Sequence, residues 1–230
     1  MAAITTRASR IAGPTKPART GTRARAGAPA AETAASAEKC YPALTELIGY
    51  LRSLSGRADL KVLHRLLSNL RITRRDIEPA CAFGVRGYRR NTIARSDHFE
   101  LLALCWRSGH CTPIHNHTGV SCAFRVVHGR GTEIRFTESP AGIVCPAQVN
   151  DMPEGYVCAA EEDDIHQVAN HQAPGRDLVT LHIYSPPIRK MHVFCYPSSN
   201  GAENQVYDAA TAPATPATRP SRARRTAKRR

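Results

Sequence analysis

The chain has 230 residues, enough for one domain with a sizeable apolar core. Its formal net charge is +13, but residues 1–39 contribute +5 and residues 209–230 contribute +7, so residues 40–208 carry a net charge of only +1. A near-neutral folded region argues against a basic groove for nucleic acid as the primary function.

The N-terminal segment, residues 1–39, is rich in Ala, Thr, Pro and Arg and has few large apolar residues. This composition buries too little apolar surface to offset the entropy lost on ordering, so we expect a disordered basic tail. The segment is Arg-rich and acid-poor, as organelle transit peptides are, although it lacks a clear amphipathic helix. Organelle targeting is therefore an alternative to a cytoplasmic location.

Two helices are expected next, over residues 41–54 and 57–70. In the second, Leu60, Leu63 and Leu67 fall on one stripe at helical spacing, and Asp59 lies near its start. Pro79 marks the end of the helical region.

From residue 88 onward, short runs of β-forming residues alternate with Gly, Pro, Asn and Asp turns. Many short strands at regular spacing are typical of a sandwich or barrel. The sequence thus predicts a mainly β fold within residues 40–208, an antiparallel barrel or jelly roll preceded by two or three N-terminal helices. The strands are expected over residues 88–94, 99–106, 122–128, 132–137, 142–149, 155–160, 165–170, 178–184 and 192–196.

Two histidines, His115 and His117, stand at positions i and i+2 of an extended segment, so both imidazoles point to the same side and can reach one metal ion. With the glycines at 109 and 129 they resemble the first cupin motif, except that Cys122 stands at its acidic ligand position. His166 and Asn170 match the ending of the second cupin motif, although the Pro-x-Gly that usually precedes it is missing.

A site of three histidines has a distinct chemistry. Three neutral imidazoles leave a bound dication with its full charge, which favours a soft anionic ligand such as a thiolate. Three protein ligands also leave positions open for substrate and O2. The donor set alone does not identify the metal, because three histidines also suit zinc.

The span from residue 88 to 194 resembles the cysteine dioxygenase family of cupin thiol dioxygenases. The resemblance implies that His115, His117 and His166 hold one Fe(II) per chain, and that L-cysteine and O2 are converted to cysteine sulfinate. The matching segments are Tyr88-Arg89-Arg90-Asn91, Leu104-Cys105-Trp106, residues 109–117, Cys122, His166 and residues 181–187.

The resemblance also assigns roles around the metal. Arg90 matches the arginine that pairs with the substrate carboxylate, a task suited to a bidentate guanidinium, and Tyr88 shares its face. Thr180, His182 and Tyr184 stand at i, i+2 and i+4 and so line one strand face. They match a catalytic Ser-His-Tyr triad, with Thr in place of Ser.

Cys122 matches the cysteine that forms a thioether with the active-site tyrosine in part of the family, which implies a crosslink between Cys122 and Tyr184. Three further positions bear on the comparison. Asn116 replaces a common Asp between the ligand histidines, Met191 stands near the substrate where mammalian members have Cys, and Ser185-Pro186 is expected to be cis.

The C-terminal segment, residues 209–230, is basic, resembles the N-terminus in composition, and is expected to be a disordered tail with at most weak polyanion binding.

The sequence shows no secretory signal core and no apolar run of transmembrane length, so no membrane partner is expected. None of the eight cysteines forms a C-x-x-C pair, which argues against a zinc ribbon, and we expect reduced thiols in a cytoplasmic monomer.

Two other functions are kept as alternatives. One is dioxygenation of a related thiol such as 3-mercaptopropionate, although Arg90 and Cys122 both favour cysteine. The other is a non-catalytic cupin that binds a metal and senses a ligand, which would need neither the polar triad nor open metal positions.

Overall fold

The computed structural model describes residues 34–117, 119–160, 165–195 and 205–208. The chain divides into two units, Met1–Ala30 and Ala31–Arg230, and every described element belongs to the second unit. Apart from residues 34–39, both predicted tails lie outside the described residues, so their disorder stays a prediction.

Three α-helices and two 3-10 helices come first in the described chain. The predicted helix at 41–54 is wrong at its start, because Tyr41 has non-helical backbone angles before Pro42, a position that disfavours the α conformation. Helical structure also begins earlier than predicted, and Ala37 is fully buried. The elements are α1 (Ala34–Cys40), η1 (Pro42–Leu44), α2 (Thr45–Arg52), α3 (Leu60–Asn69) and η2 (Arg74–Ala80).

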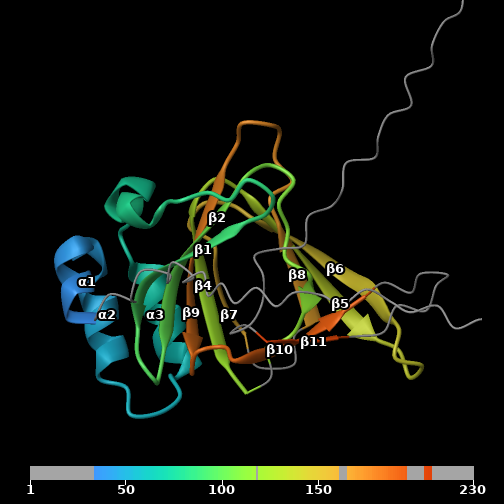
Figure 1. The fold of residues 1–230 in the computed structure, drawn as a ribbon, viewed down its shortest axis with the longest axis horizontal. Coiled ribbons are helices and arrows are strands. Elements are labelled where there is room, and N and C mark those ends of the chain that lie inside the picture. Colours follow the sequence, from blue (N-terminus) through green and yellow to red (C-terminus); the bar gives the residue numbers. More distant parts are fainter. Residues whose placement is uncertain (1–33, 118, 161–164, 196–204, 209–230) are drawn as a thin grey trace, which may run out of the picture. The chain divides into compact units, whose positions relative to one another are not determined.

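The strands form two antiparallel sheets (Figure 1). The first sheet has the order β1-β2-β9-β4-β7, and the second has the order β11-β10-β3-β8-β5-β6. The strand β11 was not predicted, whereas β3 falls within the extended segment predicted around His115 and His117. The bounds are β1 (Arg89–Arg95), β2 (Glu100–Trp106), β3 (Ile114–His115), β4 (Ser121–His128), β5 (Gly131–Glu138), β6 (Val144–Met152), β7 (Val157–Ala160), β8 (Ile165–Ala169), β9 (Leu178–Ser185), β10 (Lys190–Phe194) and β11 (Gln205–Asp208).

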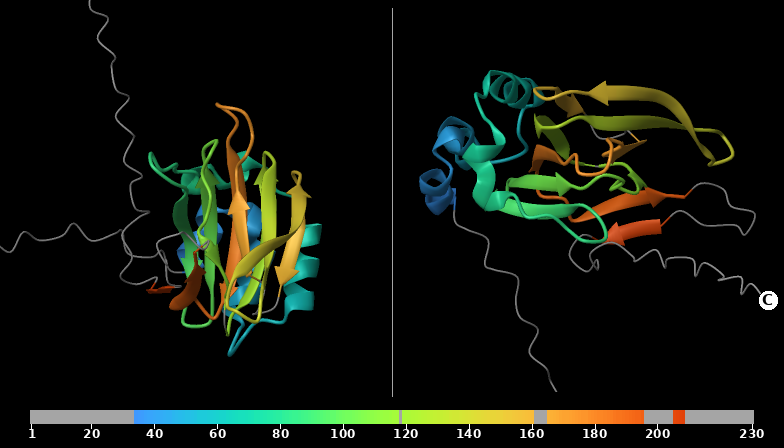
Figure 2. Two further views of the ribbon diagram at one scale, coloured as in Figure 1. Left: turned by 90° about the vertical axis from the view of Figure 1, so that its right-hand side faces the viewer. Right: turned by 90° about the horizontal axis from the view of Figure 1, so that it is seen from above.

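The three helices lie against one face of the five-stranded sheet (Figures 1 and 2). Side chains alternate between the two faces of a strand, so every second residue of β2 and β9 meets the helices. The shared apolar cluster includes Leu47 and Leu63 from the helices, with Leu101 and Leu181 from the strands. Both strands are buried along their whole length because the opposite face is covered as well.

The opposite face of β2, β4 and β9 looks toward the second sheet. Leu104, Trp106, Phe124 and Tyr184 belong to a separate buried cluster on this side. The predicted fold class, mainly β with N-terminal helices, is confirmed. No helix in the described part of the chain combines the length and apolar character needed to cross a bilayer.

Candidate metal centre

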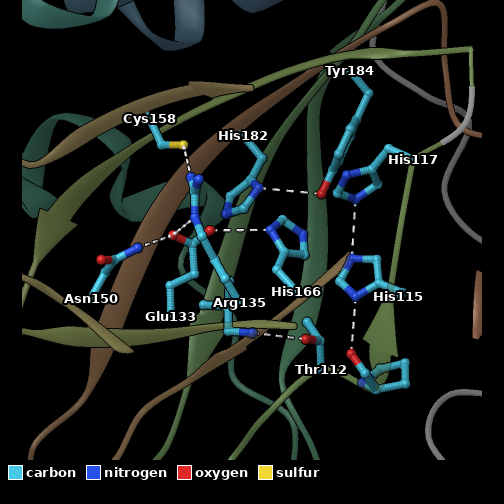
Figure 3. A network of polar contacts seen from close by, with 12 residues as sticks. Thr112, His115, His117, Glu133, Arg135, Asn150, Cys158, His166, His182 and Tyr184 are labelled. Carbon is cyan, nitrogen blue, oxygen red and sulfur yellow. Dashed lines mark hydrogen bonds and ion pairs between the residues drawn. The ribbon is translucent and has the colours of Figure 1, made fainter. Parts of the chain in front are cut away.

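Three buried histidines converge between the two sheets (Figure 3). His115 ends β3, and His117 lies two residues further along the chain. His166 lies on β8 as the Cα partner of His115. One ligand nitrogen from each histidine lies within 4.8 Å of the others, and His115 Nε2 is 3.0 Å from His117 Nε2. The i, i+2 spacing and the third histidine thus meet as the sequence predicted.

Neighbouring acceptors fix the tautomers of two histidines. The backbone carbonyl of Pro113 lies 2.9 Å from His115 Nδ1, and a carboxylate oxygen of Glu133 lies 3.1 Å from His166 Nδ1 (Figure 3). Because both partners can only accept, each Nδ1 carries the proton, and Nε2 presents its lone pair toward the centre of the cluster. Hydrogen bonds of this kind orient metal-ligating histidines in many sites.

His115 and His117 are neutral near pH 7. Burial, followed by the proximity of His166, lowers the pKa of His115 to about 3. Burial, followed by the proximity of His115 and His166, holds the pKa of His117 well below its ordinary value. Neutral imidazole is the form of histidine that binds metals.

The donor set fits a metal ion. Two nitrogen lone pairs at the 3.0 Å separation of His115 and His117 repel one another unless a proton or a cation lies between them. A third imidazole from His166 completes a cluster of three nitrogen donors. Such a set suits iron, zinc or copper and leaves positions open for other ligands.

A line of hydrogen bonds runs along the inner face of β9. His182 Nδ1 lies 3.2 Å from the hydroxyl of Tyr184, and His182 Nε2 lies 3.0 Å from Thr180 Oγ1. The indole N–H of Trp106 donates to the same Thr180 oxygen over 3.1 Å. Buried polar groups on a barrel wall are costly unless they are bonded, and this line satisfies all of them.

Burial keeps both titratable groups of this line, Tyr184 and His182, uncharged. It raises the pKa of Tyr184 well above its ordinary value, with the nearby Cys122 thiol acting in the same direction. It lowers the pKa of His182 well below the ordinary value, and the charge of Arg90 adds to the effect. The tyrosine is therefore a phenol and the histidine a neutral imidazole near pH 7.

Arg90, on β1, brings the positive charge of the site. Its guanidinium carbon lies 5.3 Å from the centre of the Tyr184 ring, and its Nη2 lies 3.1 Å from Glu100 Oε2. Burial lowers the pKa of Arg90, but Tyr184, Glu100 and Tyr88 together raise it. Arg89, the preceding residue, is exposed, as the alternation of side chains along a strand predicts.

A single pocket brings these groups together. Tyr88 stacks on Trp106 with 4.3 Å between ring centres. Cys122 on β4 is the direct cross-strand partner of Tyr184 on β9. Met191 is buried at the pocket wall, and the Ser185-Pro186 bond is cis, as predicted. The lining includes all three histidines together with Tyr88, Arg90, Cys122, His182, Tyr184 and Met191.

Sequence reasoning missed three groups that shape the site. Glu133 is fully buried behind His166, Glu100 pairs with Arg90, and the Pro113 carbonyl orients His115. Only Pro113 had a sequence signal, since it precedes the histidine pair. The two acids lie on other strands, and their proximity depends on strand register, which the residue pattern does not give.

The sequence profile described as cysteine dioxygenase type I matches residues 40–196. The chain belongs to the cysteine dioxygenase type I family. The match spans all ten strands from β1 to β10, so the whole site described above falls within the family region. The predicted family is thereby confirmed.

Individual members of the cysteine dioxygenase family share about a third of their residues with this chain over the aligned part. Human cysteine dioxygenase type 1 is 32% identical over 119 residues, which cover 46% of this chain and 55% of the human protein. The bovine enzyme of the same name is 30% identical over 164 residues, covering 60% of this chain and 78% of that protein. The chain therefore aligns with only about half the length of the human relative.

Solved structures match only part of the chain. One is a sugar phosphate isomerase from a cupin superfamily of Silicibacter pomeroyi, with a TM-score of 0.38 and 13% identity. The match covers 56% of this chain and 81% of that structure.

Proposed function

We propose that this protein is a non-haem iron(II) dioxygenase that converts L-cysteine and O2 to cysteine sulfinate. The observation that carries the proposal is that three imidazole donors share one pocket with the Arg90 guanidinium and the Tyr184 phenol. The reaction needs no other reductant, because both oxygen atoms of O2 are added to the thiol sulfur.

His115, His117 and His166 would hold the iron. The ion would supply the redox chemistry that lets O2 react with a thiolate, and its charge would favour the thiolate form of the substrate. Because none of the three protein donors is an anion, the substrate thiolate would be the main anion at the centre. This preference for an anionic thiolate distinguishes the site from a metal site that contains a carboxylate ligand.

Arg90 would bind the carboxylate of cysteine. A guanidinium can grip a carboxylate with two parallel hydrogen bonds, which fixes orientation as well as charge. Tyr88 lines the same pocket and, through its stack on Trp106, is held at the substrate end. Orienting the substrate in this way places its thiol toward the histidine cluster.

The Tyr184 hydroxyl would donate a hydrogen bond to the bound substrate. If His182 carries its proton on Nδ1, it donates to the Tyr184 oxygen, and the phenol hydrogen is then directed to the substrate. The Thr180 hydroxyl donates to His182 Nε2 in that arrangement, while Trp106 donates to Thr180. Thr180 and His182 thus serve as the relay that orients Tyr184.

Cys122 and Tyr184 would form a thioether. The two residues are directly opposite on neighbouring antiparallel strands, a position where side chains lie close enough to react. A bond between the Cys122 sulfur and an aromatic carbon of Tyr184 would release two hydrogen atoms, and O2, the co-substrate of the proposed reaction, would be the oxidant that accepts them.

We also propose that the enzyme acts as a cytoplasmic monomer that binds neither membranes nor, as a primary partner, nucleic acid. None of the eight cysteines, all of which lie in the described residues, is in a disulfide. A reducing compartment suits both these thiols and a thiol substrate. Light scattering of the purified protein gives the mass of the assembly.

The deciding experiment starts with protein loaded with Fe(II) without oxygen, to which L-cysteine and then isotopically labelled O2 are added. We expect cysteine sulfinate that carries two labelled oxygen atoms. A His166→Ala variant removes one donor and should form none. Cystine as the sole product would contradict the proposal.

The same assay separates the alternatives. Faster turnover of 3-mercaptopropionate than of L-cysteine, at equal concentration, would assign the enzyme to the related thiol. Stoichiometric iron binding without oxidation of either thiol would identify a non-catalytic cupin.

A further inference from the structure

Glu133 is a fully buried carboxylate directly behind a metal ligand. It lies on β5, and its Oε1 accepts a hydrogen bond from His166 Nδ1 over 3.1 Å (Figure 3). The side chain is wholly shielded from solvent. Burying a carboxylate costs free energy unless several hydrogen-bond donors surround it, so we asked which donors stabilise Glu133 and what its charge does at the site.

Two further donors hold the second oxygen of Glu133. Arg135 Nε lies 3.2 Å from Oε2, and Asn150 Nδ2 lies 3.0 Å from the same atom. Asn150 is the direct cross-strand partner of Glu133 on β6, and Gln148 donates to the Asn150 amide oxygen over 2.7 Å. The carboxylate is thereby fixed in one orientation, with Oε1 aimed at His166.

The position of this charge complements the histidine cluster. The cupin pattern has an acidic ligand where this chain has Cys122, so none of the three direct donors is an anion. The bond to His166 Nδ1 passes negative charge to the ring and makes Nε2 a stronger donor. The same bond prevents the proton from moving to Nε2, where it would block metal binding.

We propose that Glu133 is a positioning residue for the metal centre, which sets the tautomer and donor strength of His166. Its carboxylate also supplies, behind the ligands, the negative charge that an acidic residue at position 122 would have supplied. This inference rests on the metal-binding part of the proposed function and is independent of the substrate.

The test measures metal affinity without cysteine or O2. Metal-free protein is titrated with Co(II), whose visible absorption reports the donor set, in competition with a chelator of known affinity. Glu133→Gln keeps an oxygen that accepts from His166 but removes the charge, and we expect the Co(II) affinity to fall roughly 10–100-fold. Glu133→Asp should recover part of the loss.

Glu138→Gln is the matched control. This acid lies on the same strand, β5, at an exposed position away from the histidines, so its replacement should leave Co(II) affinity unchanged. Equal affinity of Glu133→Gln and the wild-type protein would overturn the inference. A wild-type protein that binds no Co(II) would instead defeat the metal assignment itself.

A second variant keeps the test open if Glu133→Gln does not fold. Asn150→Ala retains the carboxylate but removes one donor that orients it. We expect a several-fold loss of Co(II) affinity, smaller than that caused by Glu133→Gln. Unchanged affinity in a folded Asn150→Ala protein would count against orientation of Glu133 as the source of its effect.

Discussion

Arg90 and Glu100 form an ion pair beside Tyr184, with 3.1 Å between Arg90 Nη2 and Glu100 Oε2. Glu100 is the cross-strand partner of Tyr184, and its other oxygen lies 3.6 Å from Arg95 Nη1. The guanidinium proposed to bind the substrate carboxylate therefore already has an anionic neighbour. The negative charge of Glu100 should weaken the binding of a second carboxylate there.

Replacing Glu100 by Gln tests this relationship. Gln keeps an oxygen that accepts from Arg90, so orientation is retained while like-charge repulsion of about 1 kcal/mol is removed. We expect the KM for L-cysteine to fall on the order of fivefold. Cysteamine, which has no carboxylate, should show no such change, and a raised KM for cysteine would refute the charge argument.

Arg90→Ala should raise the KM for L-cysteine by roughly 10–100-fold, because a hydrogen bond to a charged group contributes about 1.5–3 kcal/mol. Steady-state kinetics in saturating O2 provide the measurement. Arg89→Ala is the matched control, since Arg89 is exposed on the opposite strand face. An Arg90→Ala enzyme with the wild-type KM would remove Arg90 from the substrate site.

Thr180→Ala should lower both stability and kcat. Without the hydroxyl, the indole N–H of Trp106 and one ring nitrogen of His182 lose their buried partner, which costs about 1–3 kcal/mol. Denaturant unfolding of the metal-free protein measures this loss. Thr180→Ser keeps the hydroxyl and should stay near wild type in kcat, and equal kcat in both variants would show that the relay is unnecessary.

The thioether has a direct mass signature. Trypsin releases Cys122 in the peptide 108–125 and Tyr184 in the peptide 177–189. In iron-loaded, oxygen-exposed protein we expect the two peptides joined, at their summed mass less two hydrogen atoms. Cys122→Ser, and wild-type protein prepared without iron, should give separate peptides. Separate peptides from fully active enzyme would rule out the crosslink.

Asp59 caps the N-terminus of α3, where its Oδ1 accepts from the backbone N–H groups of Lys61 and Val62. Asp59→Ala should lower the free energy of unfolding by about 1 kcal/mol. The expected fall in Tm is roughly 2–4 °C for a protein of this size. Asn at this position also caps well, so Asp59→Asn should unfold close to the wild-type temperature.

The histidine cluster was predictable because its members follow rules of local spacing. His115 and His117 share a strand face by alternation, and His166 was found from its place in a second motif. The inner face of β9 was predictable for the same reason, since Thr180, His182 and Tyr184 are separated by two residues each.

The remaining parts of the site depend on which residues face one another across strands. Glu133 reaches His166 only because β5 pairs with β8 in one register, and Glu100 reaches Arg90 through the pairing of β1 with β2. These contacts between strands cannot be predicted from the residue periodicity within a single segment.

The strand β9 performs two tasks with one stretch of chain. Val179, Leu181 and Ile183 pack under the helices, while the residues between them form the polar line of the pocket. A deletion of one codon within this strand would exchange the two sets, placing hydroxyls in the apolar layer and aliphatic groups beside the histidines. Natural variants of this protein should therefore differ in β9 by substitution and keep its length constant.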